Sequence, residues 1–217
     1  MKHIEISKRV FHFKQPAGTS RGIYTTRQCY FLTLTDDGMP GIKGVGECAP
    51  LPKLSCDDLP DYETILHQIC KLVESTDKIP YDLLRPYPSI LFGLETAFAQ
   101  LKAHGSTMLF DTPFGRGEEG IRINGLVWMG SFDEMAERLE AKLRQGFHCV
   151  KLKIGAIDFE KEIELIRHIR KSFDKRQVEL RVDANGAFTP KNALQHLETL
   201  AKYDIHSIEQ PIKQHQW

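Results

Sequence analysis

The sequence predicts an α/β protein in which a small α+β domain precedes a parallel array of alternating strands and helices. Two observations support this prediction. Strand-like segments are followed by helical segments within residues 1–105, whereas strand and helix patterns alternate strictly within residues 106–217. Segregated elements are typical of an α+β domain, and strict alternation with short connections is typical of a parallel sheet.

Residues 1–105 are expected to form an antiparallel meander followed by two helices. The turn formers Asp36, Asp37 and Gly38 separate two strand-like runs, which favours a meander. The second helical pattern begins at Ser89, a suitable N-cap, and ends just before Gly105. In GIKGVGE no Lys-Ser/Thr pair follows the glycines, so a turn is expected there and not a phosphate loop. The expected strands are 2–14, 28–35 and 42–52, and the expected helices are 57–73 and 89–104.

The second part of the chain is expected to contain four strands and three helices in strict alternation. Ser131 is an expected helix cap, Gly146 an expected helix stop, and Pro190 stands in the first turn of the last helix. The expected strands are 121–129, 148–154, 178–184 and 205–211, and the expected helices are 131–146, 158–173 and 189–203.

The composition argues against nucleic acid or a membrane as a partner. The 29 Lys and Arg residues balance 29 Asp and Glu residues and are mixed along the chain. No apolar run approaches the roughly 20 residues that cross a bilayer, and the first residues lack the apolar core of a signal peptide. Five cysteines without a CxxC pair suit a reducing compartment, so we expect a cytoplasmic protein; the oligomeric state is left open.

The segment VKLKIG, residues 150–155, carries two lysines on one face of an expected strand. Three apolar residues alternate with Lys151 and Lys153, so a period of two places both ammonium groups on the same side. Taken alone, such a pair is typical of a solvated strand edge. In a βα barrel the apolar residues would face the helices and the lysines the interior, where charge is costly and indicates function.

Carboxylates on the next two strands support the interior placement. Asp183 follows Lys153 by 30 residues, and Glu209 follows Asp183 by 26 residues. Each spacing suits one βα unit, so the three groups should reach neighbouring strands at a similar height. They would lie near the carboxyl ends of the strands, where active sites of such barrels are found.

This set of residues suits metal-assisted proton removal. Two carboxylates on neighbouring strands are hard oxygen ligands that fit Mg²⁺, with Mn²⁺ as an acceptable substitute. Lys153 can act as a base only in its neutral form, and both partial burial and the neighbouring ammonium of Lys151 disfavour its charged form. A neutral lysine opposite a metal ion can remove a proton α to a carboxylate, so the expected partner is a small-molecule carboxylate.

The motifs resemble those of the enolase superfamily. VKLKIG is similar to the KxK motif of that family, VDANGAF to the metal-ligand motif after the third barrel strand, and IEQP to the ligand motif of the fourth. FGLETAFAQL resembles the helix that leads into the barrel. The resemblance covers essentially the whole chain.

Within that superfamily the chain resembles the muconate-lactonizing branch. The branch has an N-terminal α+β capping domain and a (β/α)7β TIM-type barrel, which implies a capping domain over 1–105 and the first four barrel strands over 106–217. The segments GVGECAPLP and INGLVWMG are most similar to the o-succinylbenzoate synthases. These eliminate water from 2-succinyl-6-hydroxy-2,4-cyclohexadiene-1-carboxylate in a step toward menaquinone.

The resemblance also assigns roles to the candidate residues. It makes Lys153 the general base and Lys151 its electrostatic neighbour. Asp183 and Glu209 become Mg²⁺ ligands, and Asn185 lies close to the metal ion or its waters.

Two arginines are candidates for contacts with the substrate. Arg181 is an inward orienting group or, equally, the partner of Glu179 in an ion pair. Residues 15–27 resemble a mobile capping loop that closes over the substrate, and Arg21 in this loop is expected to contact it.

Part of the family's site falls outside these residues. The resemblance implies a third metal carboxylate on the fifth strand and a second catalytic lysine on the sixth, and the sequence contains four expected strands. We interpret the chain as part of a longer polypeptide. Two alternatives stay open: a dipeptide epimerase or N-succinylamino acid racemase of the same branch, and a truncated barrel that binds a dicarboxylate without turnover.

Overall fold

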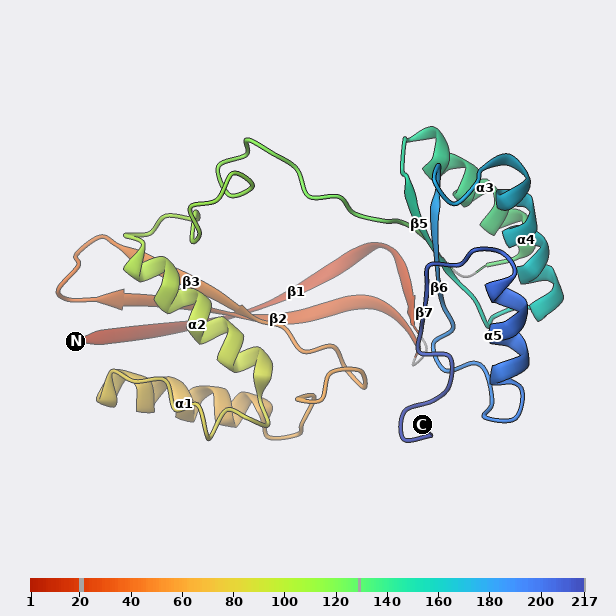
Figure 1. Ribbon diagram of the computed structural model, residues 1–217. Helices are drawn as coiled ribbons and strands as arrows, with labels where there is room; N and C mark the ends of the chain where they lie inside the picture. The colour runs from red at the N-terminus through yellow and green to blue at the C-terminus, as the bar shows by residue number, and fades with distance from the viewer. Residues whose placement is uncertain (20–21, 129, 217) are drawn as a thin grey trace. The chain divides into compact units, whose positions relative to one another are not determined.

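The chain divides into two compact units, Met1–Gly120 and Ile121–Trp217 (Figure 1). The structure is a computed structural model that describes residues 1–19, 22–128 and 130–216. Residues 103–124, between the last helix of the first unit and the first strand of the second, contain neither helix nor strand. Among the described residues, none of the helices is both long and apolar enough to cross a bilayer.

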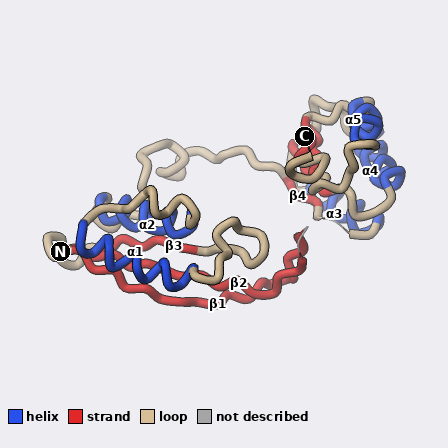
Figure 2. Tube along the Cα trace, turned by 90° about the horizontal axis from the view of Figure 1, so that it is seen from below, coloured by secondary structure: helices blue, strands red, loops and turns tan. Residues whose placement is uncertain are grey.

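The first unit is a three-stranded antiparallel sheet with two helices on one face (Figure 2). Its elements are β1 (Lys2–Thr19), β2 (Gly22–Asp36), β3 (Lys43–Cys48), α1 (Tyr62–Thr76) and α2 (Pro88–Lys102), and the strand order is β1-β2-β3. Leu32 on β2 packs in one core with Leu66 on α1 and Leu94 on α2, and all three are buried. The alternating strand pattern thus buries one face under the helices.

The expected loop over residues 15–27 is corrected by the structure. Residues 15–19 and 22–27 belong to β1 and β2, which continue as an antiparallel hairpin far beyond the helices. The pairing shifts register between His12 and Ala17, so the extra chain length is absorbed as an irregularity within the strand ladder. Backbone pairing of this kind leaves no sequence signal when its side chains are largely exposed.

Both helices of the first unit begin at other residues than expected. Helix α1 begins at Tyr62, because Asp57 is used elsewhere: its Oδ2 accepts the backbone N–H of Ser89 at 2.8 Å. Helix α2 begins at Pro88, a favoured first helical residue, so Ser89 lies inside the helix and is not its N-cap.

Glycines allow strand β3 to lie directly against helix α2. A Cβ on Gly46 would meet the carbonyl oxygen of Gly93 at 1.7 Å, and one on Gly93 would meet Sγ of Cys48 at 2.4 Å. A Cβ on Gly44 would meet the carbonyl oxygen of Ala97 at 1.9 Å. The segment GIKGVGE lies mostly in strand β3, so the expectation of a turn there holds only for its first residue, Gly41, and its other glycines provide the close backbone contact.

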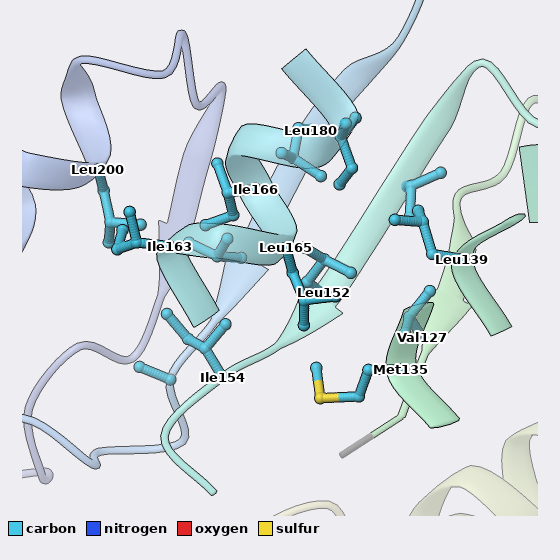
Figure 3. Packing of buried hydrophobic residues seen from close by; sticks show 14 of the residues in the cluster. Val127, Met135, Leu139, Leu152, Ile154, Ile163, Leu165, Ile166, Leu180 and Leu200 are labelled. Atoms are coloured by element: carbon cyan, nitrogen blue, oxygen red, sulfur yellow. The ribbon is translucent and has the colours of Figure 1, made fainter. Parts of the chain in front are cut away.

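The second unit is a four-stranded parallel sheet with three helices packed on one face. Its elements are β4 (Gly125–Val127), α3 (Phe132–Arg144), β5 (Cys149–Lys153), α4 (Phe159–Ser172), β6 (Glu179–Asp183), α5 (Ala193–Ala201) and β7 (Ser207–Glu209), in the strand order β4-β5-β6-β7. Figure 3 shows Leu152 and Leu180 of the sheet packing against Ile163 and Ile166 of α4. The strict alternation expected from the sequence is confirmed.

Helix caps explain where the helices of the second unit begin. Ser131 forms a complete capping box with Glu134, as its sequence position indicated. Helix α5 begins only at Ala193, because Thr189 and Asn192 form a turn in which the Asn192 side chain accepts the Thr189 N–H at 2.7 Å. Strand β4 is shorter than expected, since Ile121 and Ile123 are exposed and lie outside the strand ladder.

We predict that Gly46→Ala destabilises the first unit. The added methyl group would collide with the α2 backbone, and overpacking of this kind lowers the free energy of unfolding by about 1–3 kcal/mol. Gly120→Ala is the matched control, because a Cβ there would meet nothing within 4 Å. Urea unfolding followed by circular dichroism measures both; equal midpoints for the two variants would contradict the close β3–α2 contact.

Candidate active site

The two lysines of β5 lie on the face of the parallel sheet opposite the helices. Val150 and Leu152 are buried in the core beneath the helices, whereas Lys151 and Lys153 are only partly buried. The next strand follows the same alternation, with Leu180 and Val182 among the buried core residues. In both strands, the apolar residues that were predicted to face the helices therefore do so in the structure.

Strand register brings the candidate residues into one row. Lys153 is the pairing partner of Asp183, and Asp183 is the pairing partner of Glu209. Each is the last residue of its strand. Parallel pairing thus places one ammonium group and two carboxylates side by side at the carboxyl ends of β5, β6 and β7.

Both lysines contact the buried carboxylate of Asp183. Its Oδ2 accepts hydrogen bonds from Nζ of Lys153 at 3.0 Å and forms an ion pair with Nζ of Lys151 at 3.3 Å. Lys151 also donates to Oε2 of Glu209. The Asp183 side chain is 3% exposed and that of Glu209 is 61% exposed, so the row runs from a buried carboxylate to an accessible one.

Ionisation in this cluster is set by burial and by pairing. Burial raises the pKa of Asp183, but hydrogen bonds from Lys153 and from the backbone N–H of Asn185 outweigh it and leave the pKa below its ordinary value. Burial lowers the pKa of Lys151, whereas its bonds to Glu209 and Asp183 raise it, and the net shift is upward. The structure therefore holds a carboxylate with a charged lysine beside it.

An aromatic ring borders the lysine. Trp128 follows β4, is partly exposed, and places its ring 5.5 Å from Nζ of Lys153. A cation over an indole ring is attracted by the negative face of the ring. Trp128 therefore lies at the edge of the site, in contact with Lys153, and is not a core residue.

A turn after β6 fixes Asn185 beside Asp183. The backbone N–H of Asn185 donates to Oδ1 of Asp183 at 3.1 Å, and Asn185 has a left-handed φ of 48°, which asparagine tolerates. The next residue, Gly186, donates its N–H to the carbonyl of Gln210 at 2.7 Å. The turn is thus tied to the end of β7.

The structure describes one of the two candidate arginines, Arg181, and its ion pair lies outside this cluster. Among the described residues, the Arg181 guanidinium hydrogen-bonds to Oε1 of Glu179 at 2.6 Å, which is the ion-pair alternative. That contact lies toward the other end of β6, away from Asp183. Arg21 lies outside the described residues.

The oxygen chemistry of the two carboxylates suits a divalent cation. Among the described residues, no group of three or more His, Cys, Asp and Glu side chains could hold a metal ion. Asp183 and Glu209 nevertheless share the ammonium of Lys151, so both already face one cationic position. Mg²⁺ is commonly held by one or two carboxylates together with water, and these two residues fit it as such ligands.

A buried acid near the site was not foreseen from the sequence. Glu162 on α4 is 2% exposed, and its Oε1 accepts the backbone N–H of Gly155 at 2.6 Å. Burial raises its pKa to about 7, against the opposing effect of these N–H groups. The available signal was its position: Glu162 precedes Ile166 and Ile169 at helical spacing and so falls on the apolar face of its helix.

Family models match both units of the chain. Residues 134–217 match the enolase C-terminal domain-like family, and residues 17–101 match the MenC N-terminal domain. The chain belongs to the enolase superfamily. The row of Lys153, Asp183 and Glu209 lies within residues 134–217, the segment that matches the enolase C-terminal domain-like family.

The chain resembles synthases and epimerases of the superfamily. It is 41% identical to the o-succinylbenzoate synthase of Desulfotalea psychrophila, over 94% of the chain and 63% of the synthase. A crystal structure of MenC from that organism superimposes with a TM-score of 0.76 at 35% identity, covering 100% of the chain and 66% of MenC. The L-Ala-D/L-Glu epimerase of Bacillus subtilis is 27% identical over 96% of the chain and 59% of the epimerase. The chain thus spans less than two thirds of these relatives.

We predict that Glu162 makes stability fall as pH rises. Its pKa is about 7 in the folded chain and about 4.5 when unfolded, so the folded state binds the proton more tightly. The stabilising contribution is fully present below about pH 4.5 and is lost as pH rises through about 7, a change of about 3 kcal/mol.

Urea unfolding of wild type and Glu162→Gln between these pH values measures the contribution, because the glutamine variant lacks the titrating group. Glu164→Gln, an exposed acid on the same helix, is the matched control and should follow wild type. A Glu162→Gln profile parallel to that of wild type would contradict the prediction.

Proposed function

We propose that the protein containing this chain is a Mg²⁺-dependent lyase of the o-succinylbenzoate synthase type. It would eliminate water from 2-succinyl-6-hydroxy-2,4-cyclohexadiene-1-carboxylate in menaquinone biosynthesis. The observation that carries the proposal is the row of Lys153, Asp183 and Glu209 on adjacent strands. Identity of 41% to a curated synthase supports the choice of reaction.

Lys153 is the proposed general base. Its Nζ lies at the carboxyl end of β5, between the Trp128 ring and the Asp183 carboxylate. In this arrangement the ammonium donates to Asp183, and it must release one proton to solvent before its nitrogen can act as a base. If Asp183 held a metal ion, its carboxylate would no longer favour the charged form of Lys153, and the neutral amine could face the substrate.

Asp183 and Glu209 are the proposed ligands of Mg²⁺, or of Mn²⁺ in its place. When bound, the ion supplies positive charge that stabilises the negative charge developing on a substrate carboxylate as its α proton leaves. Asn185 supports this arrangement, because its backbone N–H holds Oδ1 of Asp183, while Oδ2 faces the ammonium groups of Lys153 and Lys151. Lys151 adds a second positive charge beside both carboxylates.

One lysine can complete a syn elimination. Lys153 takes the proton α to the carboxylate, and the electron pair of the broken C–H bond forms the new ring double bond. The C–O bond to the neighbouring hydroxyl group breaks as this double bond forms. The protonated lysine, on the same face, returns its proton to the departing oxygen, so that water leaves and Lys153 is again neutral.

The remaining assignments concern substrate binding. We propose residues 1–105 as the capping domain and Arg21 as a contact for a substrate carboxylate. Arg181 is proposed as an orienting group for the substrate, beside its ion pair with Glu179. The five free cysteines suit the reducing cytoplasm as the site of action, on a small-molecule carboxylate.

Epimerisation of dipeptides is a second candidate, favoured by the similarity to the Bacillus subtilis epimerase over 96% of the chain. It uses the same proton removal but needs a second base on the opposite face of the α carbon. The two reactions differ in their products: elimination releases water, whereas epimerisation exchanges the α proton with solvent. A non-catalytic relative would bind the dicarboxylate and leave it unchanged.

We predict that the complete protein with Mg²⁺ consumes the cyclohexadiene substrate and that Lys153→Ala abolishes this activity. General base catalysis contributes about 10²–10⁴-fold to a rate, so kcat should fall by about 10²-fold or more. Loss of substrate absorbance measures turnover, with and without a chelator. Lys161→Ala, an exposed lysine on α4, is the matched control and should retain wild-type kcat.

Retained turnover in Lys153→Ala would contradict the assignment of the base. No turnover by folded wild type would contradict the synthase proposal. Deuterium exchange at the α carbon of dipeptides and N-succinylamino acids in D₂O then tests the second candidate, and binding without exchange indicates a non-catalytic relative.

A further inference from the structure

Glu162 is a buried acid outside the row of candidate catalytic residues. Among the described residues it is one of three buried charged side chains, with Asp57 and Asp183. It lies in the first turn of α4, and its Oε2 is buried without a hydrogen-bond partner in the described part of the chain. A buried carboxylate with an unpaired oxygen is costly, so its retention needs a reason.

The described hydrogen bonds of the Glu162 side chain go to the connection between β5 and α4. Its Oε1 accepts the backbone N–H of Gly155 at 2.6 Å and that of Ile157 at 3.5 Å. Gly155 is only two residues after Lys153. The side chain therefore anchors the segment that leaves the strand carrying the candidate base.

That segment packs tightly against the turn after β6. A Cβ on Gly155 would meet the Cβ of Ala187 at 2.2 Å and the carbonyl oxygen of Ala184 at 3.2 Å. Gly155 also has a φ of +92°, which a side chain would disfavour. The position of Gly155 therefore limits where the turn containing Ala184 and Ala187 can lie.

This turn directly follows Asp183, the last residue of β6, which carries the buried carboxylate. Ala184 follows Asp183 directly, and the N–H of Ile154 donates to the backbone carbonyl of Asp183 at 2.8 Å. A movement of the β5–α4 connection would thus displace the ends of both β5 and β6. The Lys153–Asp183 hydrogen bond joins these two strand ends.

We infer that Glu162 is a positioning residue of this site: through the backbone of Gly155 it sets the relative placement of Lys153 and Asp183. The inference rests on the proposed function for its effect on catalysis. Glu162 touches neither the substrate position nor the carboxylates by any described contact, and it acts through the backbone. Residues that orient a metal ligand or a base from behind commonly contribute about 10–100-fold to activity or metal affinity.

The test compares variants of the complete protein with Mg²⁺. Glu162→Leu removes the acceptor for Gly155 and should lower kcat by about 10–100-fold with KM unchanged. Glu162→Gln keeps an oxygen that can accept the Gly155 N–H and should recover most of kcat. Hydrogen exchange of the Gly155 amide, followed by NMR, should be faster in Glu162→Leu and near wild type in Glu162→Gln.

Two controls separate positioning from general destabilisation. Glu164→Leu makes the same change at an exposed position of α4 and should leave kcat and the Gly155 amide unchanged. Ile169→Ala removes a buried side chain from the far end of α4 and should lower the unfolding midpoint without the loss of kcat.

The outcomes distinguish this inference from the proposed function. Wild-type kcat and a protected Gly155 amide in Glu162→Leu would overturn the positioning role, as would an equal loss of kcat in Ile169→Ala. If wild type turns over no cyclohexadiene substrate, the proposed function fails. The exchange rate of the Gly155 amide and the dissociation constant for Mg²⁺ then test the positioning role. A change of these values in Glu162→Leu, but not in the two control variants, supports the role, and no change overturns it.

Discussion

The buried carboxylate of Asp183 is the interaction on which the rest of the site depends. A carboxylate removed from water is strongly destabilising unless cations and hydrogen-bond donors surround it. Here it receives the ammonium groups of Lys151 and Lys153 and the backbone N–H of Asn185. Each partner is supplied by a different feature of the fold. Strand pairing places Lys153 beside Asp183, the period of two along β5 puts Lys151 on the same face, and a left-handed turn presents the N–H of Asn185. The cluster is therefore a property of strand register and not of one local motif.

The same alternation produces both the core and the site. On β5, every second residue enters the apolar layer beneath the helices, and the residues between them carry the charged groups. Packing against α4 fixes the strand from one face, and the ion pairs join the strand ends on the other. Glu162 connects the two faces, because it belongs to the helix layer and holds the backbone just beyond Lys153. This explains why a residue of the core can influence charged groups across the sheet.

The parallel unit could be predicted closely from the sequence because its signals are periodic. Alternating apolar residues gave the faces of β5 and β6, and spacing of one βα unit gave the shared height of Lys153, Asp183 and Glu209. Features set by tertiary contacts could not be predicted. The strand segments 17–19 and 22–24 are held by backbone pairing, and the N–H of Ser89 in the first turn of α2 is accepted by Asp57 from a distant turn. The ion pair of Arg181 with Glu179 on the same strand was likewise one of two alternatives that the sequence left open.

The most direct test of the central claim is a crystal structure of the complete protein with Mg²⁺ bound. The account predicts that carboxylate oxygens of both Asp183 and Glu209 ligate the ion and that Lys153 no longer donates to Asp183. Its Nζ should then face the open side of the row, beside the ring of Trp128. A metal ion bound elsewhere, or a Lys153–Asp183 hydrogen bond that persists with the ion in place, would contradict the account.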